Sequence, residues 1–548
     1  MSAPSPVLAA PVRRPTREVL LKRKRGRFLG LTGDSLAKVV FQANAAVSII
    51  VLALITFTIF RDAIDFIPQN RKNLQIYRLA GLEFVDLLRR PVEDYTSLNR
   101  ELSSIRNAEM NLLVQQGLSP TAAVGRLHDF DQFAVQVGEA IAPHEALLGT
   151  LTELATSLKE RQKVSQDLTE ARSNLTQALA NASAVQAAEL HRQLDALVVE
   201  EINYQTEVQP MRAVLPELYE ANKALHAKLM ALADRTPSFA EPAIQKRLDR
   251  LALLLRQFPE TLEDSTHAME AWDQAKPVSW WESTHAFLFG QEWITASFWQ
   301  DWYGVIPLFA GSLLISALAL MMAIPLGVAA AVYVNQVARP FEQHFIKPAI
   351  EFIAAIPSVV LGFFGIAILG ETLRRVSQMP SLSWIPGFPM AERLNATTAA
   401  CLLAFMAVPT IFSLAEDALN NVPRSFKEAS LAMGATRLQT LIHIILPAAL
   451  SGIMAAILLG LGRVIGETMV VLLCAGNRIQ TPDFSAGLGA FFQPVHTMTG
   501  IIAQEMGEVV RGSLHYRALF MVGAALFMIS LLINWLAQKI VRRYRIAS

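Results

Sequence analysis

Six long apolar stretches divide this chain of 548 residues. The first is uncharged from Val39 to Phe60, and a long polar region separates it from the others. A membrane-spanning helix needs roughly 20 consecutive, mainly apolar residues. The pattern therefore predicts six membrane-spanning helices. The later five stretches are Ile306–Val332, Ala349–Leu369, Ala396–Leu414, Ile445–Leu473 and Ala518–Leu536.

The polar region, residues 61–303, has a repeat of its own. Leucines recur at spacings of mostly three, four or seven residues, with charged and glutamine side chains between them. This repeat is typical of long amphipathic helices packed as a coiled coil or antiparallel hairpin. We therefore expect an all-α membrane protein with a large helical, coiled-coil-like insertion. The leucines are Leu147, Leu151, Leu154, Leu158, Leu168, Leu175, Leu179, Leu190, Leu194 and Leu197.

The placement of basic residues predicts on which side of the membrane each element lies. Residues 1–38 hold nine Lys or Arg against two acidic residues, and the tail carries Lys539, Arg542, Arg543 and Arg545. Basic flanks favour the cytoplasmic side, so both termini are expected there. The expected parts are a cytoplasmic tail (1–38), a first transmembrane helix (39–60), a periplasmic helical domain (61–303), a five-helix core (304–538) with a cytoplasmic loop (416–444), and a second cytoplasmic tail (539–548).

Composition and motifs argue against several classes of function. The chain is 52% hydrophobic, and its net charge of +1 gives no bulk attraction to nucleic acid. It lacks the G-x-x-x-x-G-K-[ST] phosphate loop, so it does not bind ATP by that motif. Cys401 and Cys474 have no metal-ligand or redox spacing. We expect no catalytic residue, metal site or cofactor.

The loop between the fourth and fifth stretches has helix signals. Ser425 with Glu428, and Thr436 with Gln439, have the spacing of capping boxes, which start helices. Gly434 suits the left-handed position that ends one. The loop is therefore expected to form two short helices around Gly434. Local structure alone favours an ordinary amphipathic linker at the membrane surface.

The spacing in this loop resembles the EAA motif of ABC import permeases, E-A-A-x3-G-x9-I-x-L-P. Ser430 replaces the second alanine of that motif. The resemblance implies coupling helices seated in a groove of a separate ATPase, with Glu428 and Gly434 central to the contact. The matching residues are Glu428, Ala429, Ser430, Gly434, Ile444, Leu446 and Pro447.

The fifth stretch contains two charges, Arg463 and Glu467, four residues apart and thus on one face of a continuous helix. A charge at mid-bilayer costs about 2.5–3.5 kcal/mol on insertion scales, so such residues face a bundle interior or a wet cavity. We interpret Arg463 as presenting a guanidinium to an oxyanion, with Glu467 orienting it and partly balancing its charge. A purely structural ion pair is the alternative.

Small residues at four-residue spacing mark the same stretch. They suit close helix packing, including contact with a second permease subunit. They are Gly452, Ala456 and Gly460, and Gly462 with Gly466.

Segments in three of the apolar stretches or at their edges resemble PstC-type permeases of phosphate importers. They are GLGRVIGETMVV (460–471), AIPSVVLGFFG (355–365), and the pair YGVIP (303–307) and IPLG (324–327). The resemblance covers about residues 300–545. It implies a bacterial inner-membrane phosphate permease with a PstA-like second permease, a homodimeric PstB-like ATPase and a PstS-like periplasmic phosphate-binding protein.

Two alternatives stay open. An arginine in the pathway does not distinguish phosphate from sulfate, molybdate or phosphonate, because these oxyanions share their charge. In addition, an N-terminal anchor followed by a long helical external domain also describes sensors, so a transporter-derived sensory membrane protein is the other reading.

Overall fold

The computed structural model describes residues 27–28, 31–180, 184–200, 202–295, 297, 299–382, 384–385 and 387–543, and these are mainly helical. Strands occur in this part only as two antiparallel hairpins, β1 (Arg27–Phe28) with β2 (Leu31–Thr32) and β3 (Trp293–Ile294) with β4 (Trp302–Tyr303). The basic residues before position 27 and Arg545 lie outside the described residues. The expected all-α fold is confirmed.

Five helices in the described residues are long and apolar enough to cross a membrane, and a bent pair makes a sixth candidate. Each overlaps one apolar stretch of the sequence, so the count agrees with the expectation. The five contain α2 (Gly33–Ile64), α14 (Ile306–Val332), α18 (Ala396–Asn420), α21 (Leu446–Ile465) and α24 (Leu514–Arg543).

The third apolar stretch is not the single straight span expected over Ala349–Leu369. Helix α15 (Pro340–Ala354) meets the segment Ser358–Ser377 at 90°. Pro357 lies in this bend, and proline interrupts a helix because it has no backbone N–H to donate. The segment after the bend consists of α16 (Ser358–Phe364), η2 (Gly365–Leu369) and α17 (Gly370–Ser377).

The remaining membrane-side elements are short and connect the long helices. They are η1 (Tyr333–Val337), η3 (Pro380–Leu382), α19 (Arg424–Ala432), α20 (Arg437–Thr440), η4 (Leu441–Ile445), α22 (Met469–Cys474), η5 (Phe484–Phe492) and α23 (Met498–Glu505). Helices α14, α18 and α21 pack together around a core of mainly Ala, Leu, Ile and Val side chains.

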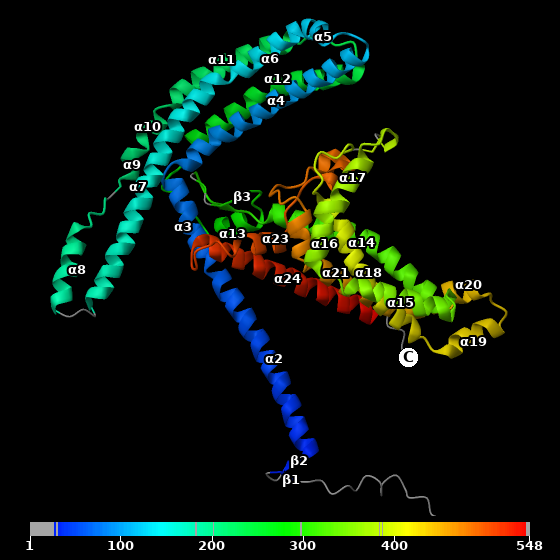
Figure 1. Ribbon diagram of the computed structural model, residues 1–548. Helices are drawn as coiled ribbons and strands as arrows, with labels where there is room; N and C mark the ends of the chain where they lie inside the picture. The colour runs from blue at the N-terminus through cyan, green and yellow to red at the C-terminus, as the bar shows by residue number, and fades with distance from the viewer. Residues whose placement is uncertain are drawn as a thin grey trace, which may run out of the picture.

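A second helical body, here called the arm, follows α2 (Figure 1). One branch packs α4, α6, α11 and α12 along one another, while α7 continues in the other direction to pair with α8. The helices of the arm are α3 (Phe66–Leu79), α4 (Leu82–Gln115), α5 (Pro120–Arg126), α6 (His128–Ala140), α7 (Ala142–Ala180), α8 (Ala184–Ala196), α9 (Tyr204–Glu207), α10 (Gln209–Arg212), α11 (Leu215–Asp234), α12 (Pro242–Glu270) and α13 (Trp280–Leu288).

The leucine repeat explains how α7 serves both branches. In its first half Leu147, Leu151 and Leu158 are buried in the core of the arm. In its second half Leu168 and Leu175 are only half-buried, and α8 is the helix that packs against this half of α7 (Figure 1). The repeat thus packs a bundle at one end and a two-helix hairpin at the other.

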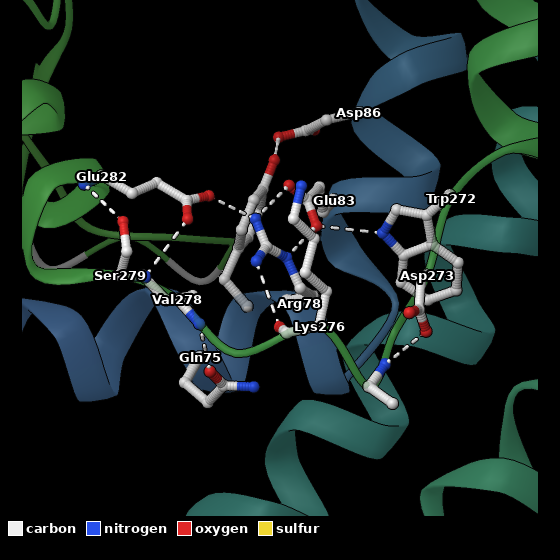
Figure 2. A network of polar contacts seen from close by, with 12 residues as sticks. Gln75, Arg78, Glu83, Asp86, Trp272, Asp273, Lys276, Val278, Ser279 and Glu282 are labelled. Atoms are coloured by element: carbon white, nitrogen blue, oxygen red, sulfur yellow. Dashed lines mark hydrogen bonds and ion pairs between the residues drawn. The ribbon is translucent and has the colours of Figure 1, made fainter.

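Arg78, at the end of α3, joins the two ends of the arm (Figure 2). Its guanidinium donates to both carboxylate oxygens of Glu83, at 2.7 and 3.0 Å, and pairs with Glu282 of α13. It also donates to the carbonyl of Lys276 at 3.2 Å, while Trp272 Nε1 donates to Glu83 at 2.9 Å. The chain therefore enters and leaves the arm at neighbouring positions.

Candidate coupling loop and translocation residues

Two short helices, α19 and α20, form the loop between α18 and α21 and meet at Gly434. Gly434 has φ +85°, the left-handed conformation that favours glycine. Its N–H donates to the carbonyl of Leu431 at 3.0 Å, and the N–H of Ala435 donates to that of Ser430 at 3.2 Å. These two bonds make a Schellman motif, which satisfies the last carbonyls of α19.

The two capping boxes expected in this loop have different outcomes. Thr436 and Gln439 form one, with each side chain accepting the other residue's backbone N–H. The box expected from Ser425 is wrong. Helix α19 begins at Arg424, directly after Pro423, so Ser425 lies inside the first turn and cannot take the N-cap conformation.

Ser430, the residue that departs from the EAA pattern, links the two short helices. Its hydroxyl lies 2.9 Å from the hydroxyl of Thr440, and Thr440 is 1% exposed. Lys427 on the same helix donates to Gln336 at 3.1 Å, tying α19 to η1. The loop is therefore braced internally and against the end of the α14 segment.

The loop exposes large apolar side chains that no other part of the described residues covers. Phe426, Leu431, Met433 and Leu438 are 46, 40, 89 and 65% exposed. Glu428 and Ala429 of the motif are exposed beside them. Large exposed apolar side chains gathered on one short loop favour an interaction site.

Leu446 and Pro447 lie where the loop enters the membrane part. From Arg437 the helix continues through η4 into α21 without interruption. Leu446 is the first residue of α21 and packs against the core, and Pro447 comes just after η4, where its missing backbone N–H leaves one carbonyl of the preceding turn without the usual helical bond. Helices α20 and α21 are therefore parts of one continuous helical segment.

Arg463 lies in the last turn of α21, with an exposed side chain. Its Nη1 donates to Thr410 Oγ1 of α18 at 3.2 Å. Among the ion pairs of the described residues, none includes Arg463. The guanidinium thus keeps donors that are not used by any carboxylate of this part of the chain.

Glu467 does not share a helical face with Arg463, because α21 ends at Ile465 and α22 starts at Met469. The single helix expected over Ile445–Leu473 is therefore wrong. Instead, Glu467 Oε1 accepts the N–H of Met469 at 3.2 Å, and its carbonyl accepts the hydroxyl of Thr499 at 3.0 Å. Contacts from α23 and from Glu467 itself satisfy backbone groups at this break.

The glycines of α21 fall into two groups. A Cβ at Gly460 would lie 2.7 Å from Ile411, and one at Gly452 would collide with Ala418, so both mark close packing on α18 of the same chain. A Cβ at Gly462 would meet nothing within 4 Å, and one at Gly466 only carbonyls of its own segment. Ala456 is fully buried between the first two positions.

Three residues around these features were not predicted from the sequence: Thr410, Glu416 and Lys347. Thr410 holds Arg463 only through a contact between distant segments, so it has no local signal. Glu416, 8% exposed near the end of α18, pairs with Lys347 of α15. A carboxylate following an apolar run is a detectable signal, because a buried charge normally has a partner.

The membrane part of the chain is similar to known permease subunits. The sequence profile of the family described as "Binding-protein-dependent transport system inner membrane component" matches residues 323–546. The probable ABC transporter permease protein YqgH of Bacillus subtilis is 33% identical over 241 residues, which is 43% of this chain and 72% of that protein. The phosphate transport system permease protein PstC of Mesorhizobium japonicum is 32% identical over 269 residues, 46% of this chain and 79% of that protein.

Among solved structures, an inward-facing MetNI methionine ABC transporter is 20% identical, covering 44% of this chain and 94% of that one, with a TM-score of 0.32. The family match begins at residue 323 and therefore does not include the arm.

Proposed function

Because the chain belongs to the family of binding-protein-dependent transport system inner membrane components, and so is a multi-pass permease subunit of an ABC importer, we propose that its cargo is inorganic phosphate. The phosphate permeases among its relatives support this cargo. The observation that supports an oxyanion cargo is Arg463, an exposed guanidinium in a membrane segment with no carboxylate partner among the described residues, whereas the choice of phosphate among oxyanions rests on the relatives.

In this proposal Arg463 binds phosphate oxygens during translocation. Its planar guanidinium suits oxyanions because it can donate two parallel hydrogen bonds. The bond to Thr410 orients the side chain, the role that the sequence assigned to Glu467. Glu467 holds the break between α21 and α22 and so positions the segment that follows Arg463.

Coupling to a separate ATPase is assigned to α19 and α20. Their exposed apolar side chains supply the docking surface, and the unbroken path from Arg437 through η4 into α21 supplies the mechanical link. The proposed assembly adds a PstA-like second permease, a homodimeric PstB-like ATPase and a PstS-like periplasmic phosphate-binding protein. The proposed topology has both termini in the cytoplasm and residues 61–303 in the periplasm.

Uptake by the reconstituted complex tests the cargo. Labelled phosphate should accumulate in an ATP-dependent manner, and a hundredfold excess of unlabelled sulfate or molybdate should leave uptake nearly unchanged. Strong inhibition by either anion would instead favour the alternative cargo class, another tetrahedral oxyanion.

Substitutions at Arg463 test the pathway assignment separately. Arg463→Gln should abolish uptake while the complex still assembles, and Arg463→Lys should retain part of the activity because the charge remains. Arg250→Gln, at an exposed position of α12, is the matched control. Normal uptake by Arg463→Gln would refute the assignment.

A further inference from the structure

A cavity of about 680 Å³ lies at the far end of the arm, where α4, α5, α6 and the connection between α11 and α12 meet. This volume is in the range of small-molecule sites. Its lining is mainly polar and comes from four separate segments. The charged lining residues are Glu109, Arg126, Asp129 and Arg235, two of each sign.

Glu109 is the unusual member of this lining. The residue is 6% exposed, and its Oε2 atom has no hydrogen-bond partner among the described residues. Burial, together with the nearby carboxylate of Glu241, raises the pKa of Glu109. Buried carboxylates are normally paired with a cation or hydrogen-bonded, since burying an unpaired charge is costly. Among the described residues, the Oε2 atom of Glu109 is therefore buried without the partner that such an atom normally has.

Three phenylalanines form the apolar part of the lining. Phe130 lies against Phe133 and Phe239, with ring centroids 6.3 and 5.3 Å apart, and all three line the cavity. Phe130 and Phe133 are only 2 and 5% exposed, so their rings belong mainly to the core of the arm. The attraction for an ammonium group therefore comes from the carboxylate of Glu109.

The arginines of the lining suit an anionic group. Arg126 and Arg235 are exposed, and neither takes part in an ion pair of the described residues. The neighbouring Arg106 differs, because it already forms a two-pronged pair with Asp131 at 2.6 and 3.0 Å. The cavity therefore combines one unsatisfied acceptor with two guanidinium groups that are available to an anion.

We propose that this cavity binds a small zwitterion, whose ammonium group pairs with Glu109 and whose anionic group lies against Arg126 and Arg235. The site is separate from the translocation residues and from the coupling loop. It makes the arm a ligand-binding module carried by a permease subunit, and it does not depend on which oxyanion the membrane part transports.

Calorimetric titration of the full chain in lipid nanodiscs tests the proposal. The probes are glycine, 4-aminobutyrate and L-arginine, with methylammonium and acetate as the separate halves. At least one zwitterion should bind saturably, and at least tenfold more tightly than either half. Glu109→Gln should weaken that binding at least tenfold, whereas Glu217→Gln, an exposed carboxylate of α11, should leave it unchanged.

Thermal unfolding separates loss of binding from loss of fold. Glu109→Gln should not lower the unfolding temperature, since a buried neutral amide costs less than a buried unpaired carboxylate. Combined replacement of Arg126 and Arg235 by Gln should weaken the zwitterion and leave methylammonium unaffected. Absence of saturable binding by all three zwitterions, or equal binding by Glu109→Gln and the wild type, would overturn the proposal.

Discussion

Replacement of Gly434 by alanine tests the role of the turn between α19 and α20, the proposed coupling helices. At φ +85°, an added Cβ would meet no atom within 4 Å, so the substitution changes backbone strain without a collision. A left-handed conformation costs an L-residue about 1–2 kcal/mol. Alanine recovers roughly 0.4–1 kcal/mol by restricting the unfolded chain. The net penalty of about 1 kcal/mol would shift the turn equilibrium about fivefold.

A series at this position makes the test specific. Asparagine tolerates the left-handed region and valine does not, so the loss should increase from Gly434→Asn through Gly434→Ala to Gly434→Val. The assay is phosphate taken up per ATP hydrolysed by the reconstituted complex, together with copurification of the ATPase. The phosphate taken up per ATP and the amount of copurified ATPase should both fall in that order if the turn shapes the docking surface.

Gly117 provides a matched control. It has φ +93°, ends α4 with the same pair of hydrogen bonds, and an added Cβ there also meets nothing within 4 Å. Gly117→Ala should therefore carry the same strain at a site remote from the coupling loop. If Gly434→Ala reduced coupling no more than Gly117→Ala, or if asparagine were as harmful as valine, the reasoning would be refuted.

Three further predictions concern the arm and the loop. Arg78→Met should destabilise the base of the arm by about 2–3 kcal/mol, less than for a fully buried pair because Glu282 is partly exposed, and hydrogen exchange of residues 272–282 should accelerate. Burial lowers the pKa of His144 below 6.5, so its neutral form is favoured in the folded arm. Stability should be retained above pH 6.5 and fall below it by at most about 1.4 kcal/mol per pH unit, and His144→Gln should flatten this part of the unfolding-temperature profile. Ser430→Ala and Thr440→Val should each cost about 1 kcal/mol, and a double-mutant cycle on loop hydrogen exchange should show that the two losses are not additive.

Much of the local structure could be predicted from sequence. The apolar stretches match the candidate spans because hydrophobicity over about 20 residues is a property of the segment itself. The box at Thr436 and the left-handed Gly434 were predictable for the same reason, since caps depend on residues within one turn. The Ser425 box failed because the neighbouring Pro423 competed for the same helix start.

The arrangement of the candidate site was decided by tertiary structure. A four-residue spacing pairs Arg463 with Glu467 only if the helix continues, and contacts from α23 support the break that separates them. The partner of Arg463 is instead Thr410, more than 50 residues away in the chain. Gly460 likewise packs on Ile411 of the same subunit, a contact that its spacing alone does not specify.

The same division holds for the arm. Its leucine repeat predicts helices, because amphipathic periodicity is local. Whether one carboxylate among many is buried without a partner depends on where four segments meet, and only the folded arm places Glu109 there. Sequence by itself thus determined the elements and the family, whereas contacts between distant residues determined which side chains have partners and which remain available to a ligand.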